Sequence, residues 1–166
     1  MISGNDKGRV ELRLEKLRLR RGELYDAQFI FYNTNSSYWV YNPFFNRLIL
    51  LPGQLAIYDA DKKYVGELKF DTGSQRSPGD TDWVFLWGGS HIGTRIGFRA
   101  GYLPGTKYWN MNNLLPAGRY YVQLILYKAF LTVNPRYLAG EKIDFYKTFD
   151  QSELCRSSAI EVELVD

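Results

Sequence analysis

The feature that most constrains the fold is a two-residue alternation of apolar and polar side chains, which recurs in short segments along the whole chain. It is clearest in residues 10–14 and in residues 160–164. Because successive side chains of a strand point to opposite faces of a sheet, this period predicts β-strands with one buried face. Strands and helical patterns do not alternate along the sequence, so a parallel α/β fold is not expected.

The chain is predicted to contain about eight or nine short strands, separated by turns rich in Gly, Pro, Asn and Asp. A short aromatic segment, Tyr38–Tyr41, follows the polar turn Asn33–Ser37. For residues 134–156 the sequence is equally compatible with a short helix and with an irregular connection. The predicted strands are residues 10–20, 24–32, 44–51, 54–59, 64–68, 83–87, 94–98, 119–131 and 160–164.

Two of these segments carry more detailed predictions. Residues 10–20 contain two alternating runs with a phase slip between them, which indicates one strand with a β-bulge. A helix with Val10, Leu14 and Leu17 on one face is the alternative for this segment. Residues 119–131 contain the longest apolar run, which predicts a central strand buried on both faces near its middle.

Short strands at these spacings favour an all-β fold, a two-sheet antiparallel β-sandwich. Aromatic residues make up 16% of the chain, and they favour sheets further. We expect one domain over residues 10–166, with residues 1–9 as a flexible lead or linker. If the terminal strands are neighbours, Glu161 and Glu163 could face Arg18 and Arg20.

The segment Leu115–Val122 resembles the penultimate strand of immunoglobulin-like and fibronectin type III-like domains of bacterial proteins. In those domains a Leu-x-x-Gly-x-Tyr run leads into a central strand, and the resemblance implies that Tyr120 bonds to upstream backbone. Ser157–Leu164 resembles their final strand, and Asn33–Ser37 one of their turns. The chain lacks their paired cysteines and exceeds their usual length. The resemblance implies an immunoglobulin-like sandwich and no particular activity.

Charge, cysteine content and hydropathy limit the classes of function. The net charge is only +3, and the densest basic stretch, residues 13–21, has Glu11 before it and Glu15 within it, so nucleic-acid binding is not expected. One cysteine excludes a disulfide within the chain. No apolar stretch is long enough to span a bilayer, and the first residues do not form a signal peptide. We expect an extracytoplasmic domain, periplasmic or secreted, without its signal peptide.

The sequence predicts no catalytic residue, metal site or cofactor. The single histidine, His91, follows Ser90 directly, and adjacent strand residues point to opposite faces. Nothing marks Cys155 as an activated thiol. Aspartates in the turns, Asp59 and Asp61 among them, could bind calcium, but aspartate is also common in turns. We therefore predict a protein that is not an enzyme; a hydrolase using His91 or loop carboxylates, or a structural spacer domain, is the alternative.

The aromatic residues supply the candidate binding surface. Tyr38, Trp39, Tyr108 and Trp109 lie beside polar or Gly-rich and Asn-rich stretches and are predicted to contact a ligand. The expected ligand is a protein or a carbohydrate. A carbohydrate site predicts an exposed, coplanar aromatic pair, whereas a protein site predicts an apolar patch or an unpaired edge strand. A protease inhibitor is a special case of a protein-binding domain, and its projecting loop would be residues 71–82.

Two other tryptophans are assigned to the core. Trp83, Phe85 and Trp87 are spaced two residues apart, so they share one face of a strand. We expect this face to be buried.

Overall fold

The computed structural model describes residues 8–34, 37–41, 53–68, 83–103, 114–132 and 151–166, and these confirm an all-β fold. They contain twelve strands, more than predicted, because several are very short. One 3-10 helix, η3, is present in this part of the chain. The elements are β1 Arg9–Leu14, β2 Arg18–Arg20, β3 Leu24–Tyr32, β4 Tyr38–Tyr41, β5 Gly53–Tyr58, β6 Tyr64–Leu68, β7 Trp83–Leu86, β8 His91–Arg99, β9 Gly118–Tyr127, η3 Lys128–Phe130, β10 Leu131–Thr132, β11 Glu153–Arg156 and β12 Ile160–Val165.

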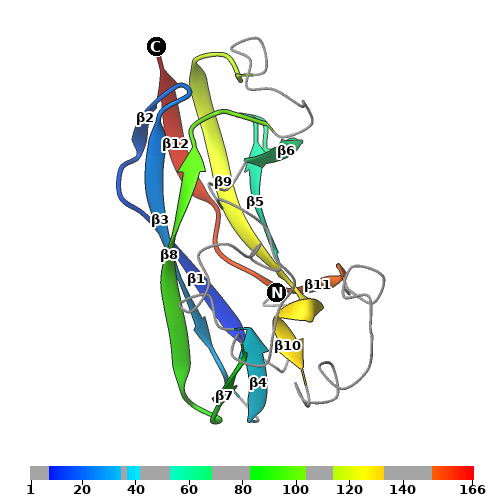
Figure 1. Cartoon of the computed structure of the whole chain (residues 1–166). Helices are drawn as coiled ribbons and strands as arrows, with labels where there is room; N and C mark the ends of the chain where they lie inside the picture. Colours follow the sequence, from blue (N-terminus) through cyan, green and yellow to red (C-terminus); the bar gives the residue numbers. More distant parts are fainter. Residues whose placement is uncertain (1–7, 35–36, 42–52, 69–82, 104–113, 133–150) are drawn as a thin grey trace, which may run out of the picture.

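Two larger sheets lie face to face (Figure 1). The first has the strand order β1-β3-β8, and the second has the order β2-β12-β9-β5-β6 with β11 also paired to β9. A third, small sheet of order β10-β4-β7 lies at one end of the molecule and was not predicted. The predicted hairpin of β5 and β6 is confirmed. The predicted strand over 44–51 and the loop 71–82 lie outside the described residues.

The phase slip in residues 10–20 is a change of sheet, and the predicted bulge is wrong. The chain leaves the first sheet at the end of β1 and enters the second as β2, which runs parallel to β12. This parallel pair also corrects the prediction of a purely antiparallel arrangement. Leu17, at the crossing, is 56% exposed. The apolar-polar pattern of residues 10–20 could not predict this change of sheet, because the pattern is the same for one bulged strand and for two strands in different sheets.

The terminal strands are neighbours, and half of the predicted charge pairing is found. Glu163 is the register partner of Arg18, and its carboxylate lies 3.5 Å from the Arg18 Nε. Arg20 and Glu161 form ion pairs with other residues. All these side chains are exposed, so each pair contributes at most about 1 kcal/mol.

The core between the sheets is aromatic near the η3 helix. The Phe130 ring meets the Phe31 ring edge-on at 5.0 Å between centroids, and Phe29 at 6.4 Å. All three side chains are fully buried. In β9 the successive residues Leu124, Ile125 and Leu126 are all buried, which confirms that this strand is buried on both faces near its middle.

The face of β7 that carries its aromatic residues is not the buried one. Leu86 is buried, whereas Phe85 is 37% and Trp87 67% exposed, so their assignment to the core is wrong. The side chain of Trp83 lies outside the described residues. Buried and exposed side chains do alternate along β7, but the buried one is the smaller Leu86, and Val40 of the paired strand is buried as well. Period alone says which residues share a face and leaves open which face is buried.

The turn before β9 closes as the resemblance implies. The Tyr120 hydroxyl donates a hydrogen bond to the Pro116 carbonyl at 2.9 Å, and the ring is buried. Burial also raises the pKa of this hydroxyl. The hydrogen bond fixes the chain where it enters the central strand.

Replacing Tyr120 with phenylalanine removes this hydrogen bond and keeps the ring. We expect the free energy of unfolding to fall by about 1 kcal/mol, because the Pro116 carbonyl loses a donor. Urea denaturation measures the difference. Tyr121→Phe is the matched control, since that hydroxyl forms no hydrogen bond to the described part of the chain. Equal stabilities of the two variants would show that the closed turn contributes nothing.

Candidate functional site

The four predicted contact residues do not define a site within the described residues. Tyr38 lies in β4, half-buried, and packs against the core. Trp39 is the register partner of Phe85 in the β4–β7 ladder, but its side chain lies outside the description. Tyr108 and Trp109 also lie outside the described residues.

His91 lies on the outer face of the first sheet, in a row of side chains with Tyr32 and Arg9. Its ring lies 5.6 Å from the Tyr32 ring, and the Arg9 guanidinium lies 4.2 Å over the same Tyr32 ring. The Tyr32 hydroxyl donates to the Glu11 carboxylate at 3.2 Å. The described contact of His91 is therefore an aromatic one.

Asp59, one of the proposed calcium ligands, organises a turn. Its Oδ1 accepts hydrogen bonds from the backbone N–H groups of Asp61 and Lys63, both at 2.9 Å. Across the described ranges, no three His, Cys, Asp or Glu side chains cluster as metal ligands would.

Cys155 lies in β11 and is mostly buried, and this burial raises the pKa of its thiol to about 12. At pH 8 only about one thiol in ten thousand is then ionised, and the thiolate is the reactive form. We expect alkylation by iodoacetamide to be at least about a hundredfold slower in the native protein than in urea-unfolded protein. Similar rates would mean that Cys155 is accessible and reactive.

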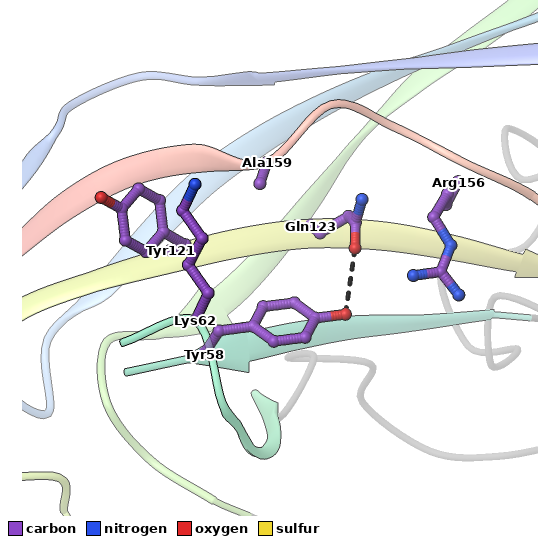
Figure 2. Close-up of a pocket in the computed structure, with 6 residues that line it drawn as sticks. All are labelled: Tyr58, Lys62, Tyr121, Gln123, Arg156 and Ala159. Carbon is purple, nitrogen blue, oxygen red and sulfur yellow. Dashed lines mark hydrogen bonds between the residues drawn. The ribbon is translucent and has the colours of Figure 1, made fainter. Parts of the chain in front are cut away.

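A hollow of about 280 Å³ opens on the outer face of the second sheet (Figure 2). We name it the tyrosine hollow. Strand pairing builds it, because Tyr58 of β5 lies directly opposite Tyr121 of β9. Its volume is near the lower limit of ligand pockets, so it fits one small ring. It is lined by Tyr58, Lys62, Tyr121, Gln123, Arg156 and Ala159.

Hydrogen bonds fix the floor of the tyrosine hollow. The Tyr58 hydroxyl donates to Gln123 Oε1 at 3.0 Å (Figure 2). Gln123 Nε2 in turn donates to the Ser157 carbonyl at 2.7 Å. Ser157 is itself buried, and its Oγ accepts from the Leu124 N–H at 3.0 Å. The amide of Gln123 is therefore held in one orientation before any ligand arrives.

Two cations flank the hollow, and only one of them is neutralised. The Arg156 guanidinium makes two hydrogen bonds to the Glu153 carboxylate, at 2.5 and 2.6 Å. This contact lowers the pKa of Glu153 and raises that of Arg156. At the other end, Lys62 Nζ lies 5.5 Å from the centroid of the Tyr121 ring.

This set of groups suits binding. Tyrosine rings offer flat apolar faces with polar edges, and the amide and ammonium groups offer directional bonds. The sequence prediction did not include the hollow, because its candidate aromatic residues were expected beside turns and loops, whereas Tyr58 and Tyr121 lie on strands. The signal was present in β9, where Tyr121 and Gln123 alternate with the buried Tyr120, Val122 and Leu124.

A larger hollow, of about 550 Å³, lies on the same sheet and is lined mainly by charged residues and glycine. Its charges are paired with one another, Arg18 with Glu163 and Arg119 with Glu161. The described residues that line it include no aromatic side chain, so it offers less for recognition than the tyrosine hollow.

Phe85 and Trp87 form a second exposed feature, at the end of β7. Their rings lie 4.9 Å apart at 87°, so they are perpendicular and do not form the coplanar pair expected of a carbohydrate site.

Among the described residues no helix has both the length and the apolar character needed to cross a membrane.

No family model matches the sequence, and no curated protein matches it. Among solved structures, it is similar to part of alkylpurine DNA glycosylase AlkC of Pseudomonas fluorescens, bound to DNA containing an abasic site analog, at 12% identity and a TM-score of 0.42. That match covers 95% of this chain and 30% of the other. A β-glucosidase from Listeria innocua, in complex with glucose, gives 10% identity, a TM-score of 0.40, and coverages of 96% and 16%. The chain thus spans less than a third of either protein, and these scores support no assignment of function.

Proposed function

We propose that this chain is a non-catalytic binding domain and that the tyrosine hollow holds a carbohydrate. The observation that carries the proposal is the convergence of two tyrosines and one fixed amide, Tyr58, Tyr121 and Gln123, on a single open hollow. A sugar ring has apolar C–H faces that pack on tyrosine rings, and its hydroxyls bond to amides. Because Gln123 is already oriented, little entropy is lost when these bonds form.

The non-catalytic part of the proposal rests on the groups that line the hollow. Those that the structure describes include no carboxylate, and catalysis of glycoside hydrolysis ordinarily needs a pair of carboxylates across the scissile bond. His91 lies on the other sheet, so it does not serve this hollow.

We propose further that the fold is an immunoglobulin-like sandwich. The hydrogen bond from Tyr120 to Pro116 supports this, as do the two facing sheets. An extracytoplasmic location, where glycans are met, is part of the same proposal.

Isothermal titration calorimetry with a panel of soluble oligosaccharides tests the function, with and without calcium. We expect saturable binding of at least one oligosaccharide, with a dissociation constant of about 10 µM to 1 mM for a site this small. Calcium should not change it. Absence of saturable binding across neutral and charged oligosaccharides would refute a carbohydrate ligand.

A second candidate is contact with a protein partner through Phe85 and Trp87. It is favoured by the exposure of these two adjoining rings, since exposed aromatic residues are common at protein interfaces. β7 lies at the opposite end of the molecule from the β5–β6 hairpin in Figure 1. Trp87→Ala should therefore leave oligosaccharide binding unchanged if the tyrosine hollow is the carbohydrate site.

A further inference from the structure

Lys62 occupies an unusual position in the hairpin that joins β5 to β6. The turn is closed by hydrogen bonds between Asp59 and Lys63 and from the Lys62 N–H to the Asp59 carbonyl, each at 2.9 Å. Lys62 has a φ of 62°, and within the described residues it is the one non-glycine residue with positive φ. Glycine is the usual residue at this place in such a hairpin, because a side chain is strained there.

The strained position places an ammonium group at the mouth of the tyrosine hollow. The Lys62 side chain reaches from the hairpin across to β9, where it lies beside Tyr121 (Figure 2). A cation over an exposed tyrosine ring contributes only modest stability. Strain that persists at a site without a large gain in stability points to a functional role.

Within the described part of the chain, the charge of Lys62 is not neutralised by a neighbouring carboxylate. Lys62 forms no ion pair with any residue that the structure describes. Arg156, the other cation of the hollow, is neutralised by Glu153. In the turn itself, Asp61 and Lys63 are exposed, and the Asp59 carboxylate accepts hydrogen bonds from their backbone N–H groups.

We propose that the ligand of the tyrosine hollow is an acidic sugar, whose carboxylate or sulfate pairs with Lys62 while its ring packs on Tyr121. This inference rests on the proposed function, because it names the class of carbohydrate for the same site. Lys62 lines the hollow and its Nζ lies 5.5 Å from the centroid of the Tyr121 ring, so an anionic substituent of a sugar bound there can reach it. Pairing there would discriminate between charged and neutral sugars of the same shape.

Lys62→Asn is the informative variant, because asparagine tolerates positive φ and carries no charge. The acidic probes are oligogalacturonate and a sulfated galactan oligosaccharide, and the neutral counterparts are methyl-esterified oligogalacturonate and unsulfated galactan. We expect wild-type protein to prefer an acidic probe over its counterpart, and Lys62→Asn to bind that probe about five- to tenfold more weakly. Its affinity for the neutral counterpart should fall by a smaller factor than its affinity for the acidic probe, and Lys62→Arg should retain the preference.

The outcomes separate this inference from the proposed function. Binding of neutral and acidic probes with equal affinity, or an unchanged preference in Lys62→Asn, would overturn the acidic-sugar proposal while the carbohydrate site stands. Failure of every sugar to bind would overturn both.

Lys62→Gly tests whether the lysine is present for stability instead. We expect its Tm to rise by about 2–4 °C, because the backbone strain is relieved, while the preference for the acidic probe is lost. A lower Tm would show that the contact with Tyr121 holds the hairpin, and it would overturn the proposal.

Discussion

Phe130→Ala is expected to lower the free energy of unfolding by about 3–5 kcal/mol, the largest change in stability that we predict. Phe130 is fully buried, and its ring meets Phe29 and Phe31 of the opposite sheet edge-on. Removing the ring loses its burial and leaves a cavity that the two remaining rings cannot fill. The expected drop in Tm is about 6–20 °C.

The experiment uses urea denaturation with two further variants. Phe130→Leu keeps most of the volume and should cost no more than about 1.5 kcal/mol, so it stays measurable if the alanine variant fails to fold. Phe85→Ala is the matched control, because this phenylalanine is partly exposed and should cost less than Phe130. Equal losses for Phe85→Ala and Phe130→Ala would contradict the position of the core described above.

The second large predicted effect is on the affinity for an oligosaccharide. Tyr121→Ala should weaken the best oligosaccharide by about 10- to 100-fold, because the variant loses the ring on which the sugar packs and the ring beside Lys62. Tyr121 is only half-buried, so the Tm should change far less than in Phe130→Ala. Calorimetry on variant and wild type measures the ratio.

The control for this variant is Trp87→Ala, which removes an aromatic ring of larger exposed area at the other end of the molecule. If Trp87→Ala weakens binding and Tyr121→Ala does not, the aromatic pair of β7 is the carbohydrate site. Loss of affinity in both variants would point to an effect on the fold.

Much of the strand content follows from the sequence alone. The bounds predicted for β3, residues 24–32, are those observed, because the polar cluster Asn33–Ser37 follows the strand. β9 and β12 were also predicted, and Tyr120 bonds to the Pro116 backbone as the resemblance implies. These features depend on residues close together in the chain.

What could not be predicted depends on residues far apart in the chain. β1 and β2 lie in different sheets because their partners are β3 and β12, and a period of two contains no information about partners. The same limit applies to β7, where Leu86 is buried and Trp87 exposed, the reverse of the expected faces, and the pattern within β7 does not show which of its faces meets the core. The tyrosine hollow arises only when β5 pairs with β9, which brings Tyr58 opposite Tyr121.

The most direct test of the carbohydrate site is to map the amide chemical shifts of the isotope-labelled protein by NMR while the best oligosaccharide is added. The proposal predicts that the largest shifts occur at Tyr58, Tyr121 and Gln123 and at the hairpin that carries Lys62. Shifts concentrated instead at Phe85 and Trp87 would show that the tyrosine hollow is not the site that binds.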